Sequence, residues 1–128
     1  MTIVVVAGSR SITEYEVVAD AIEASPFELT ELVSGGADGV DSLAETWAKQ
    51  NDVSVTQFLY TDWTGEHHPK RAPLERNKHM ASYAEAAVIV WDGESSGTEH
   101  MLEQARDAGL PVHMARTDSQ TLDTWSEE

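Results

Sequence analysis

The sequence predicts one α/β domain with a Rossmann-like, doubly wound, mostly parallel sheet of about five strands and helices on both faces. Two observations lead to this prediction. Short apolar runs alternate with segments of helical apolar spacing from residue 3 to residue 114. A chain of 128 residues, of which 41% are hydrophobic, has the size and apolar content of one packed domain. Right-handed crossovers between parallel strands then give the doubly wound arrangement.

Five apolar runs are the expected strands. Residues 3–7 form a continuous β-branched run, as expected of a strand buried on both faces. The other strands are expected at residues 31–34, 54–58, 87–91 and 112–114. We predict one domain over residues 1–114. Residues 115–128 are expected to form an acidic polar tail that is loosely held unless Trp125 docks on the body.

The first two helices follow from apolar spacing and from their end signals. Thr13 and Glu16 fit a capping box at the start of the first helix, which ends before Pro26. The second helix carries apolar side chains from Val40 to Ala48 at the spacing of a helix that faces a core. Both helices are therefore expected to pack on the sheet.

The second half of the chain contains a loop and two further helices. Residues 60–72 read as a long polar loop. A helix is expected at about residues 73–84, because proline is favoured in a first helical turn. The last helix is expected at residues 98–108, where Gly109 closes it.

The net charge is the most unusual feature of the composition. Twenty-three Asp and Glu face eight Lys and Arg, so the formal net charge is −15. Such an excess raises self-repulsion in the folded state and opposes binding to polyanions. Two explanations stay open: a salt-rich cytoplasm that screens the repulsion, and an ordinary acidic protein.

Composition also excludes several kinds of site. There is no cysteine, which excludes disulfides, thiolate metal sites and a cysteine nucleophile. The longest apolar run, residues 86–91, is too short to span a bilayer, and no signal peptide is visible. We therefore expect a cytoplasmic protein without a membrane partner, from a halophile or its virus if the salt-rich explanation holds. His67 and His68 are adjacent, and the other histidines lack metal-site spacing, so no metal is expected.

Three glycine-containing turns, residues 8–10, 35–39 and 92–98, each follow an expected strand. In a parallel sheet these turns lie at one edge, where such folds bind ligands. Glycines let the backbone approach a phosphate, and the helix N-termini that follow offer free N–H donors. Taken alone, each glycine is better explained by a tight strand-to-helix connection. Three turns converging on one edge favour a ligand site.

The candidate binding residues come from these turns and from one later helix. They are Gly8, Ser9, Arg10, Gly35, Gly36, Asp38, Gly39, Arg76, Asn77, Asp92, Gly93, Ser96, Gly97 and Thr98. The guanidinium of Arg76 can clamp a phosphate or carboxylate, or form a surface ion pair. Arg10 is a second phosphate ligand or a solvated charge. Asp38 can reach a ribose hydroxyl, and Asp92 can do the same or bind a metal through water. Asp41 is expected to serve a helix start.

Three segments resemble the SLOG superfamily, which includes LOG-type phosphoribohydrolases and the DNA-processing protein DprA. Residues 33–41 (VSGGADGVD) resemble its first glycine motif, and residues 75–81 (ERNKHMA) resemble its Arg-bearing helix. Residues 91–98 (WDGESSGT) stand where LOG enzymes carry a glycine turn. Trp63, which would either stack on a base or anchor its loop, points to the YspA-type, cpYpsA-related branch. The resemblance covers about residues 1–114.

The resemblance implies a nucleotide or nucleotide-derived ligand, no required cofactor, and a homodimer or higher homo-oligomer. It also places Arg76 facing the glycine turns. LOG enzymes cleave an N-glycosidic bond with an Arg and a Glu, and Arg76 matches the first, but Met101 occupies the position of the second. Asp41, Asp92 or Glu94 could replace this Glu from a neighbouring turn, but without the matching carboxylate we do not predict the LOG reaction.

Three functions are therefore open. The first is a module that binds a nucleotide as a sensor or processing domain. The second is a hydrolase that cleaves a nucleotide N-glycosidic or phosphate bond, with Arg76 and Asp92 as candidate catalytic residues. The third is single-stranded DNA binding as in DprA, but the sign of the net charge makes a nucleic-acid partner unexpected.

Overall fold

A computed structural model describes the backbone of residues 2–58, 72–117 and 123–127. Strands and helices alternate along almost the whole chain. They are β1 (Thr2–Gly8), α1 (Tyr15–Ala24), β2 (Leu29–Ser34), α2 (Val40–Gln50), β3 (Ser54–Gln57), α3 (Ala72–Tyr83), β4 (Ala86–Trp91), α4 (Ser96–Asp107), β5 (Val112–Arg116) and β6 (Asp123–Glu127). The predicted loop, with Trp63, His67 and His68, lies outside the described residues.

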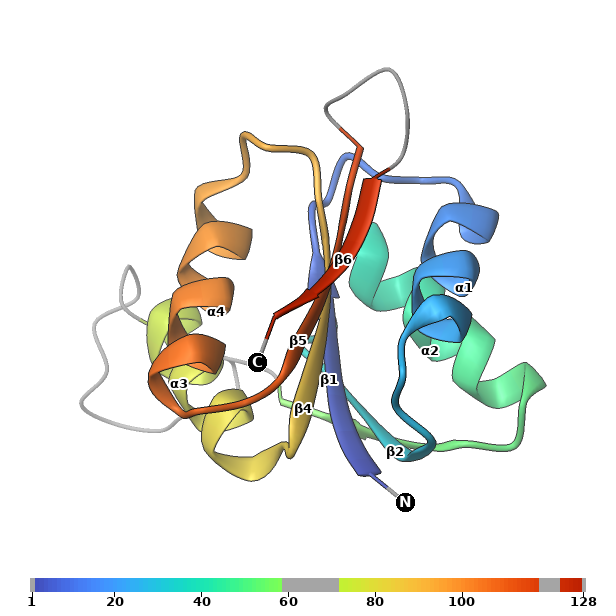
Figure 1. Ribbon diagram of the computed structural model, residues 1–128, viewed down its shortest axis with the longest axis horizontal. Helices are drawn as coiled ribbons and strands as arrows, with labels where there is room; N and C mark the ends of the chain where they lie inside the picture. Colours follow the sequence, from blue (N-terminus) through green and yellow to red (C-terminus); the bar gives the residue numbers. More distant parts are fainter. Residues whose placement is uncertain (1, 59–71, 118–122, 128) are drawn as a thin grey trace.

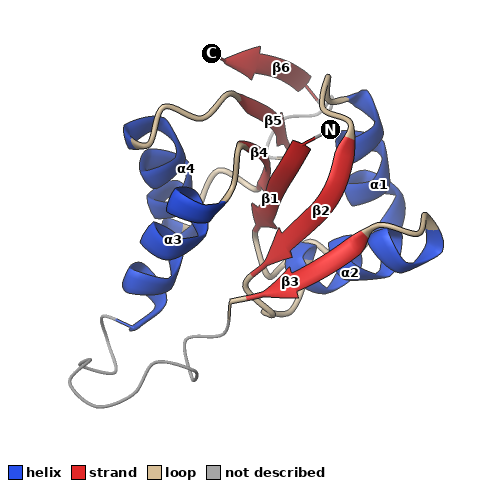
Figure 2. Cartoon of the chain, turned by 90° about the horizontal axis from the view of Figure 1, so that it is seen from below, coloured by secondary structure: helices blue, strands red, loops and turns tan. Residues whose placement is uncertain are grey.

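The strands form one sheet in the order β3-β2-β1-β4-β5-β6 (Figure 2). Strands β1 to β5 are parallel, and β6 runs antiparallel to β5. Strand β1 is central, so Val5 pairs with Val33 of β2 on one side and with Ala87 of β4 on the other. The predicted doubly wound, mostly parallel fold is confirmed.

Helices cover both faces of the sheet, with α1 and α2 on one side and α3 and α4 on the other (Figure 1). Successive side chains of a strand point to opposite faces, so Val4 and Val6 join the core under α1 and α2. Val5 and Ala7 join the core under α3 and α4. This explains why β1 is apolar from Ile3 to Ala7: both of its faces are covered there.

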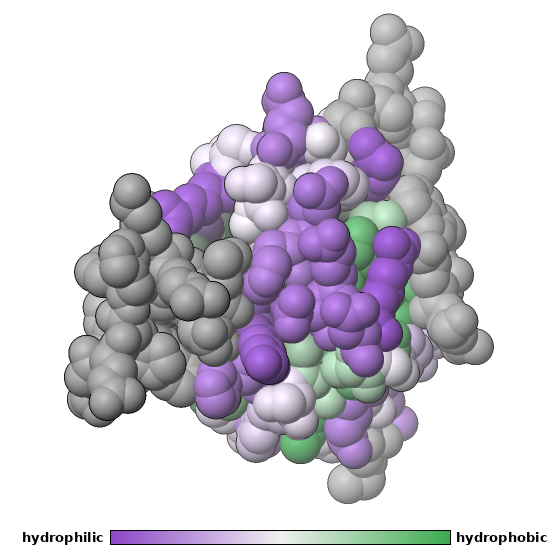
Figure 3. Space-filling model, turned by 90° about the vertical axis from the view of Figure 1, so that its left-hand side faces the viewer, coloured by the Kyte–Doolittle hydropathy of each residue, from purple (hydrophilic) through white to green (hydrophobic). Residues whose placement is uncertain are grey.

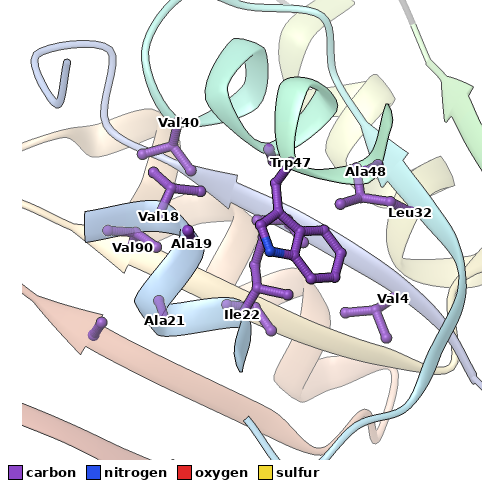
Figure 4. Packing of buried hydrophobic residues seen from close by; sticks show 14 of the residues in the cluster. Val4, Val18, Ala19, Ala21, Ile22, Leu32, Val40, Trp47, Ala48 and Val90 are labelled. Carbon is purple, nitrogen blue, oxygen red and sulfur yellow. The ribbon is translucent and has the colours of Figure 1, made fainter. Parts of the chain in front are cut away.

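The core under α1 and α2 is built around one tryptophan. Trp47 of α2 lies against Ile22 of α1, above the strands that carry Val4 and Leu32 (Figure 4). The indole Nε1 donates a hydrogen bond to Glu23 Oε2 at 3.1 Å, so its polar atom is satisfied. The interpretation of Trp47 as a core residue is confirmed.

Two helix starts differ from the prediction. Helix α1 begins at Tyr15 with Glu14 as N-cap, and no side-chain cap bond forms at this described position, so the capping box of Thr13 and Glu16 is wrong. Helix α4 begins at Ser96, two residues before the predicted start, because the Ser95 side chain caps it. Both errors come from choosing the N-cap by residue type alone.

The C-terminal segment also differs from the prediction. Strand β5 continues to Arg116, and residues 123–127 form β6, which pairs with β5 from Val112↔Glu127 to Arg116↔Asp123. A loosely held tail is therefore wrong for these residues. Polar composition hid the strand, because an edge strand is held by backbone hydrogen bonds to its neighbour.

The described helices include none long and apolar enough to cross a membrane. The face covered by α3 and α4 is largely hydrophilic in its middle (Figure 3). In the described part of the chain, Tyr83 at the end of α3 is the one large hydrophobic residue that is strongly exposed.

Candidate ligand-binding site

A cavity of about 380 Å³ lies at the carboxyl ends of β1, β2 and β4, on the side of α3 and α4. This is the edge at which the glycine turns were predicted to meet. Seven predicted site residues line it: Gly8, Arg10, Arg76, Asn77, Asp92, Gly97 and Thr98. The lining also includes Ala7, Ser11, Ala37, Asp41, Met80, Ser95 and Met101, which were not among the predicted binding residues.

Arg76 reaches the cavity from α3. Its Nη1 donates a hydrogen bond to the Gly35 carbonyl oxygen at 3.0 Å, and its Nη2 lies 3.5 Å from Asn77 Oδ1. The side chain is half-buried, so the guanidinium is held over the turn after β2 rather than spread on the surface. Arg76 therefore faces a glycine turn, as the resemblance implied.

Gly35 is the point at which Arg76 meets Asp41. A Cβ at Gly35 would stand 2.8 Å from Arg76 Nη1 and 2.9 Å from Asp41 Oδ2. Real Cβ atoms essentially never approach other atoms so closely. The missing side chain thus lets a guanidinium and a carboxylate approach each other across the backbone.

Asp41 lies in the first turn of α2 and is only 4% exposed. Its Oδ2 accepts a hydrogen bond from the Ala37 N–H at 3.3 Å. Burial raises the pKa of Asp41 to about 6, although this N–H and the nearby Arg76 guanidinium favour the ionised form. The hydrogen bond of Asp41 goes to the turn before α2 and not to a free N–H group of the helix start, as had been expected. Asp41 is also a buried acid on the cavity wall.

Asp92 follows β4, and its pKa is shifted in the opposite direction to that of Asp41. Its Oδ1 accepts hydrogen bonds from the N–H groups of Glu94 and Ser95, both at 2.9 Å. Its Oδ2 accepts one from the Ser11 hydroxyl at 2.7 Å, and its own N–H donates to Ser9 Oγ at 3.0 Å. The bonds to the carboxylate, led by the Glu94 N–H, lower the pKa of Asp92 to about 2. Asp92 therefore ties the turn after β4 to the turn after β1.

The first turn of α4 forms another wall of the cavity. The Ser95 hydroxyl oxygen accepts hydrogen bonds from Thr98 N at 3.3 Å and from Thr98 Oγ1 at 3.0 Å. Ser95 is thus the cap, whereas Ser96 is exposed and outside the cavity lining. A Cβ at Gly97 would meet no atom within 4 Å, so this position borders open space.

Asn77 links α3 to α4. It is buried, and its Nδ2 lies 3.4 Å from the Gly97 carbonyl oxygen and 3.1 Å from His100 Nδ1. Met80 and Met101 also line the cavity, each four positions after a predicted lining residue. Residues four apart share a helix face, so that spacing was a usable signal for both.

The remaining predicted residues build the turns rather than the wall. Ser9 is buried and accepts from Asp92, and Gly36 N donates to Ser34 Oγ at 3.0 Å. Gly39 has φ +77°, and a Cβ there would lie 2.6 Å from the Ser9 carbonyl oxygen. The others outside the lining are Gly35, Asp38, Gly93 and Ser96. Among the described residues, no group of three or more His, Asp and Glu is placed to hold a metal.

Comparison with known proteins identifies the family. Residues 2–64 match the YspA, cpYpsA-related SLOG family. The Gene 61 protein of Mycobacterium phage D29 is 36% identical over 118 residues, which cover 85% of this chain and 92% of that protein. The chain belongs to this SLOG family. The assignment made from the three motifs is confirmed.

The fold of this SLOG protein is shared with a solved structure. The X-ray structure of DNA processing protein A (DprA) from Streptococcus pneumoniae matches with a TM-score of 0.71 and 23% sequence identity. The match covers 87% of this chain and 49% of that one, so this chain spans about half the length of DprA. The likeness is one of fold.

Proposed function

We propose that this SLOG domain binds a nucleotide or nucleotide-derived ligand in the cavity at the sheet edge. The placement of Arg76 is the main support, because its guanidinium is held at the wall of a cavity of about 380 Å³. Small-molecule sites typically occupy roughly 300–1,000 Å³. The N-terminal turn of α4 borders open space at Gly97, where backbone N–H groups favour an anion.

The charges around the cavity describe the ligand further. Arg10 and Arg76 are opposed by Asp92, which is ionised at neutral pH, and by Asp41, which titrates near pH 6. This lining is close to electroneutral. It suits a ligand that carries a phosphate and polar sugar groups better than a strand of nucleic acid, which a net charge of −15 also repels.

We further propose that the protein acts as a homo-oligomer in the cytoplasm and needs no bound cofactor. A similar protein is encoded by a mycobacteriophage, which supports a viral or virus-related setting. The excess of acidic residues supports a salt-rich cell. Light scattering at low and molar KCl tests the oligomer, which a monomer in both solutions would contradict.

A thermal-shift screen against nucleotides, ribosyl phosphates and cyclic dinucleotides tests the binding proposal. The wild type is compared with Arg76→Ala and with Arg106→Ala, a matched control because Arg106 is exposed at the far end of α4. We expect a ligand that raises the melting temperature of the wild type and of Arg106→Ala but not of Arg76→Ala. A panel without any stabilising ligand contradicts the proposal.

A nucleotide hydrolase is the second candidate, and Asp41 is the observation that favours it. A buried carboxyl group whose pKa is raised to about 6 can hold a proton for a leaving base at near-neutral pH. In that reaction the C–N bond breaks, the base leaves with the proton of Asp41, and the water that adds to the sugar carbon returns one proton to the Asp41 carboxylate. Release of free base by the wild type but not by Asp41→Asn would support it. Intact ligand after prolonged incubation would reject it.

Single-stranded DNA binding is the third candidate, and it rests on the fold shared with a DNA-processing protein. A gel shift at low salt, where electrostatic binding is strongest, is the most permissive test. We expect no shifted band, because the charge of −15 opposes contact with phosphates. A band that disappears with Arg76→Ala would place DNA in the cavity instead.

A further inference from the structure

A second hollow adjoins the cavity. It measures about 210 Å³ and is lined by the end of the β1–α1 turn, by the start of α1 and by Thr117 after β5. Ser11 lines both the cavity and this hollow, so the two adjoin at this residue. The cavity lies toward α3 and α4, whereas the hollow lies toward α1.

The topology explains why two hollows meet here. After β1 the chain leaves toward α1 on one face, and after β4 it leaves toward α4 on the other (Figure 1). A crevice opens between neighbouring strands whose connections diverge in this way, and nucleotides bind across it in open α/β sheets. The hydroxyl of Ser11 and that of Ser9 both bond to Asp92 and hold the two turns together. The cavity and the hollow thus lie side by side at this edge of the sheet and meet at Ser11.

The lining of the hollow combines apolar walls with uncommitted polar groups. Ile12 and Val17 supply the apolar walls, and Thr13, Glu14 and Thr117 supply two hydroxyls and a carboxylate. No described residue forms a hydrogen bond with these three side chains, and Glu14 does not cap α1 with its own side chain. A flat group with polar edges finds both kinds of contact here.

The cavity and the hollow differ in the charged residues that line them. Arg10 and Arg76 lie on the cavity side together with Asp41 and Asp92, and among the described residues Glu14 is the charged one that lines the hollow. A phosphate therefore finds guanidinium partners on the cavity side, whereas the described lining of the hollow offers it a carboxylate and no cation. A carboxylate accepts hydrogen bonds through two oxygens and prefers a partner that offers two adjacent N–H groups.

We propose that the hollow receives the base of a nucleotide whose phosphate lies in the cavity, and that Glu14 selects guanine. Guanine presents its ring N–H and its exocyclic amino group side by side, whereas hypoxanthine lacks the amino group. This inference rests on the proposed nucleotide binding, and it adds the base and the residue that recognises it.

Calorimetric titration with GMP, IMP and ribose 5-phosphate tests the inference. The wild type is compared with Glu14→Gln and with Glu16→Gln, a matched control because Glu16 is exposed in the same helical turn but does not line the hollow. We expect GMP to bind about tenfold more tightly than IMP, as befits one hydrogen bond to a charged group. Glu14→Gln should remove this preference, and Glu16→Gln should keep it. Ribose 5-phosphate should bind both variants like the wild type.

Each other outcome has a meaning. Equal affinities for GMP and IMP, or a preference that survives Glu14→Gln, overturn the inference. If ribose 5-phosphate still binds and Arg76→Ala abolishes that binding, the proposed function stands alone. Absence of binding by all three ligands overturns both. A guanine-rich single-stranded oligonucleotide distinguishes the source of the base, because we expect it not to compete with GMP.

Discussion

The turns after β4 and β2 border the same cavity, but their aspartates, Asp92 and Asp41, have pKa values shifted in opposite directions. In the turn after β4, the carboxylate of Asp92 has its hydrogen-bond partners within the protein. It accepts hydrogen bonds from two N–H groups and a hydroxyl, which lower its pKa to about 2. In the turn after β2, the charge of the aspartate is less well stabilised. Its Asp41 is buried, accepts a backbone hydrogen bond from Ala37 at 3.3 Å, and has a pKa raised to about 6.

The difference indicates a structural role for Asp92 and a candidate functional role for Asp41. Hydrogen bonds within the protein stabilise the charge of Asp92 whether or not a ligand is present. This residue therefore holds the turn after β4 against the turn after β1. Burial penalises the charge of Asp41, and only Arg76 and the preceding turn offset the penalty. A group in a cleft whose pKa is strongly shifted by burial and by a charged partner is a candidate for a functional site.

Asp41→Asn should produce the largest change in stability. The folded protein binds the Asp41 proton more tightly than the unfolded chain, whose pKa is the ordinary 3.8. Ionisation therefore costs stability, and the cost grows as the pH rises from 3.8 to about 6. The variant should be more stable than the wild type at pH 7.5, by on the order of 3 kcal/mol. Urea unfolding at pH 7.5 and at pH 3.5 checks this, and an equal gain at both values would refute the burial penalty.

Asp92→Asn should have a smaller effect of opposite sign. The pKa of Asp92 is lowered in the folded state, so its charge adds stability above pH 3.8 that is lost as the pH falls toward 2. Solvent screens this partly exposed group, so we expect a loss of about 1 kcal/mol or less at pH 7. The same urea titrations measure it. A stabilised Asp92→Asn variant would remove the contrast between the two turns.

Gly97→Ala should separate stability from binding. A Cβ at Gly97 meets no atom within 4 Å, and alanine favours helix over glycine. We expect a gain of about 0.5 kcal/mol in stability with weaker nucleotide binding, because the methyl group enters the space of the ligand. Thermal melts with and without ligand measure both effects. Unchanged affinity would move the ligand away from α4.

Added salt should change the melting temperature of the wild type but have the smallest effect on the contrast between the two turns. Molar KCl screens repulsion among exposed acids, so we expect the melting temperature of the wild type to rise. The difference between Asp41→Asn and the wild type should hardly change, because salt screens a buried charge weakly. Melting in low and molar KCl checks both statements. A melting temperature that does not rise would argue against adaptation to a salt-rich cell.

Local sequence patterns predicted most of the fold. The apolar run of residues 3–7 in β1 and the spacing of Val40 to Ala48 in α2 are properties of short windows, and both elements form where expected. Strand β6 was missed because its residues are largely polar, whereas its pairing with β5 is made by backbone hydrogen bonds that composition does not reveal. The capping box at Thr13 failed because α1 begins at Tyr15 with Glu14 as N-cap, so Thr13 stands one residue before the cap position.

The site was predictable in part. Glycine turns and the family resemblance brought Arg76 to the correct edge, although its contact with Gly35 spans 41 positions of the chain. The bond between Ser11 and Asp92 spans 81 positions, so no local pattern reveals it. The burial that makes Asp41 a candidate acid likewise arises only when the turn after β2, α2 and α3 pack together.

An amide NMR titration of the full chain with GMP tests the central claim most directly. We predict chemical-shift changes that concentrate on Gly35, Gly97 and Thr98 at the sheet edge, and that disappear with Arg76→Ala but persist with Arg106→Ala. A spectrum that stays unchanged at millimolar nucleotide would contradict the claim. So would shifts confined to the outer faces of the helices, because they would place the ligand outside the cavity.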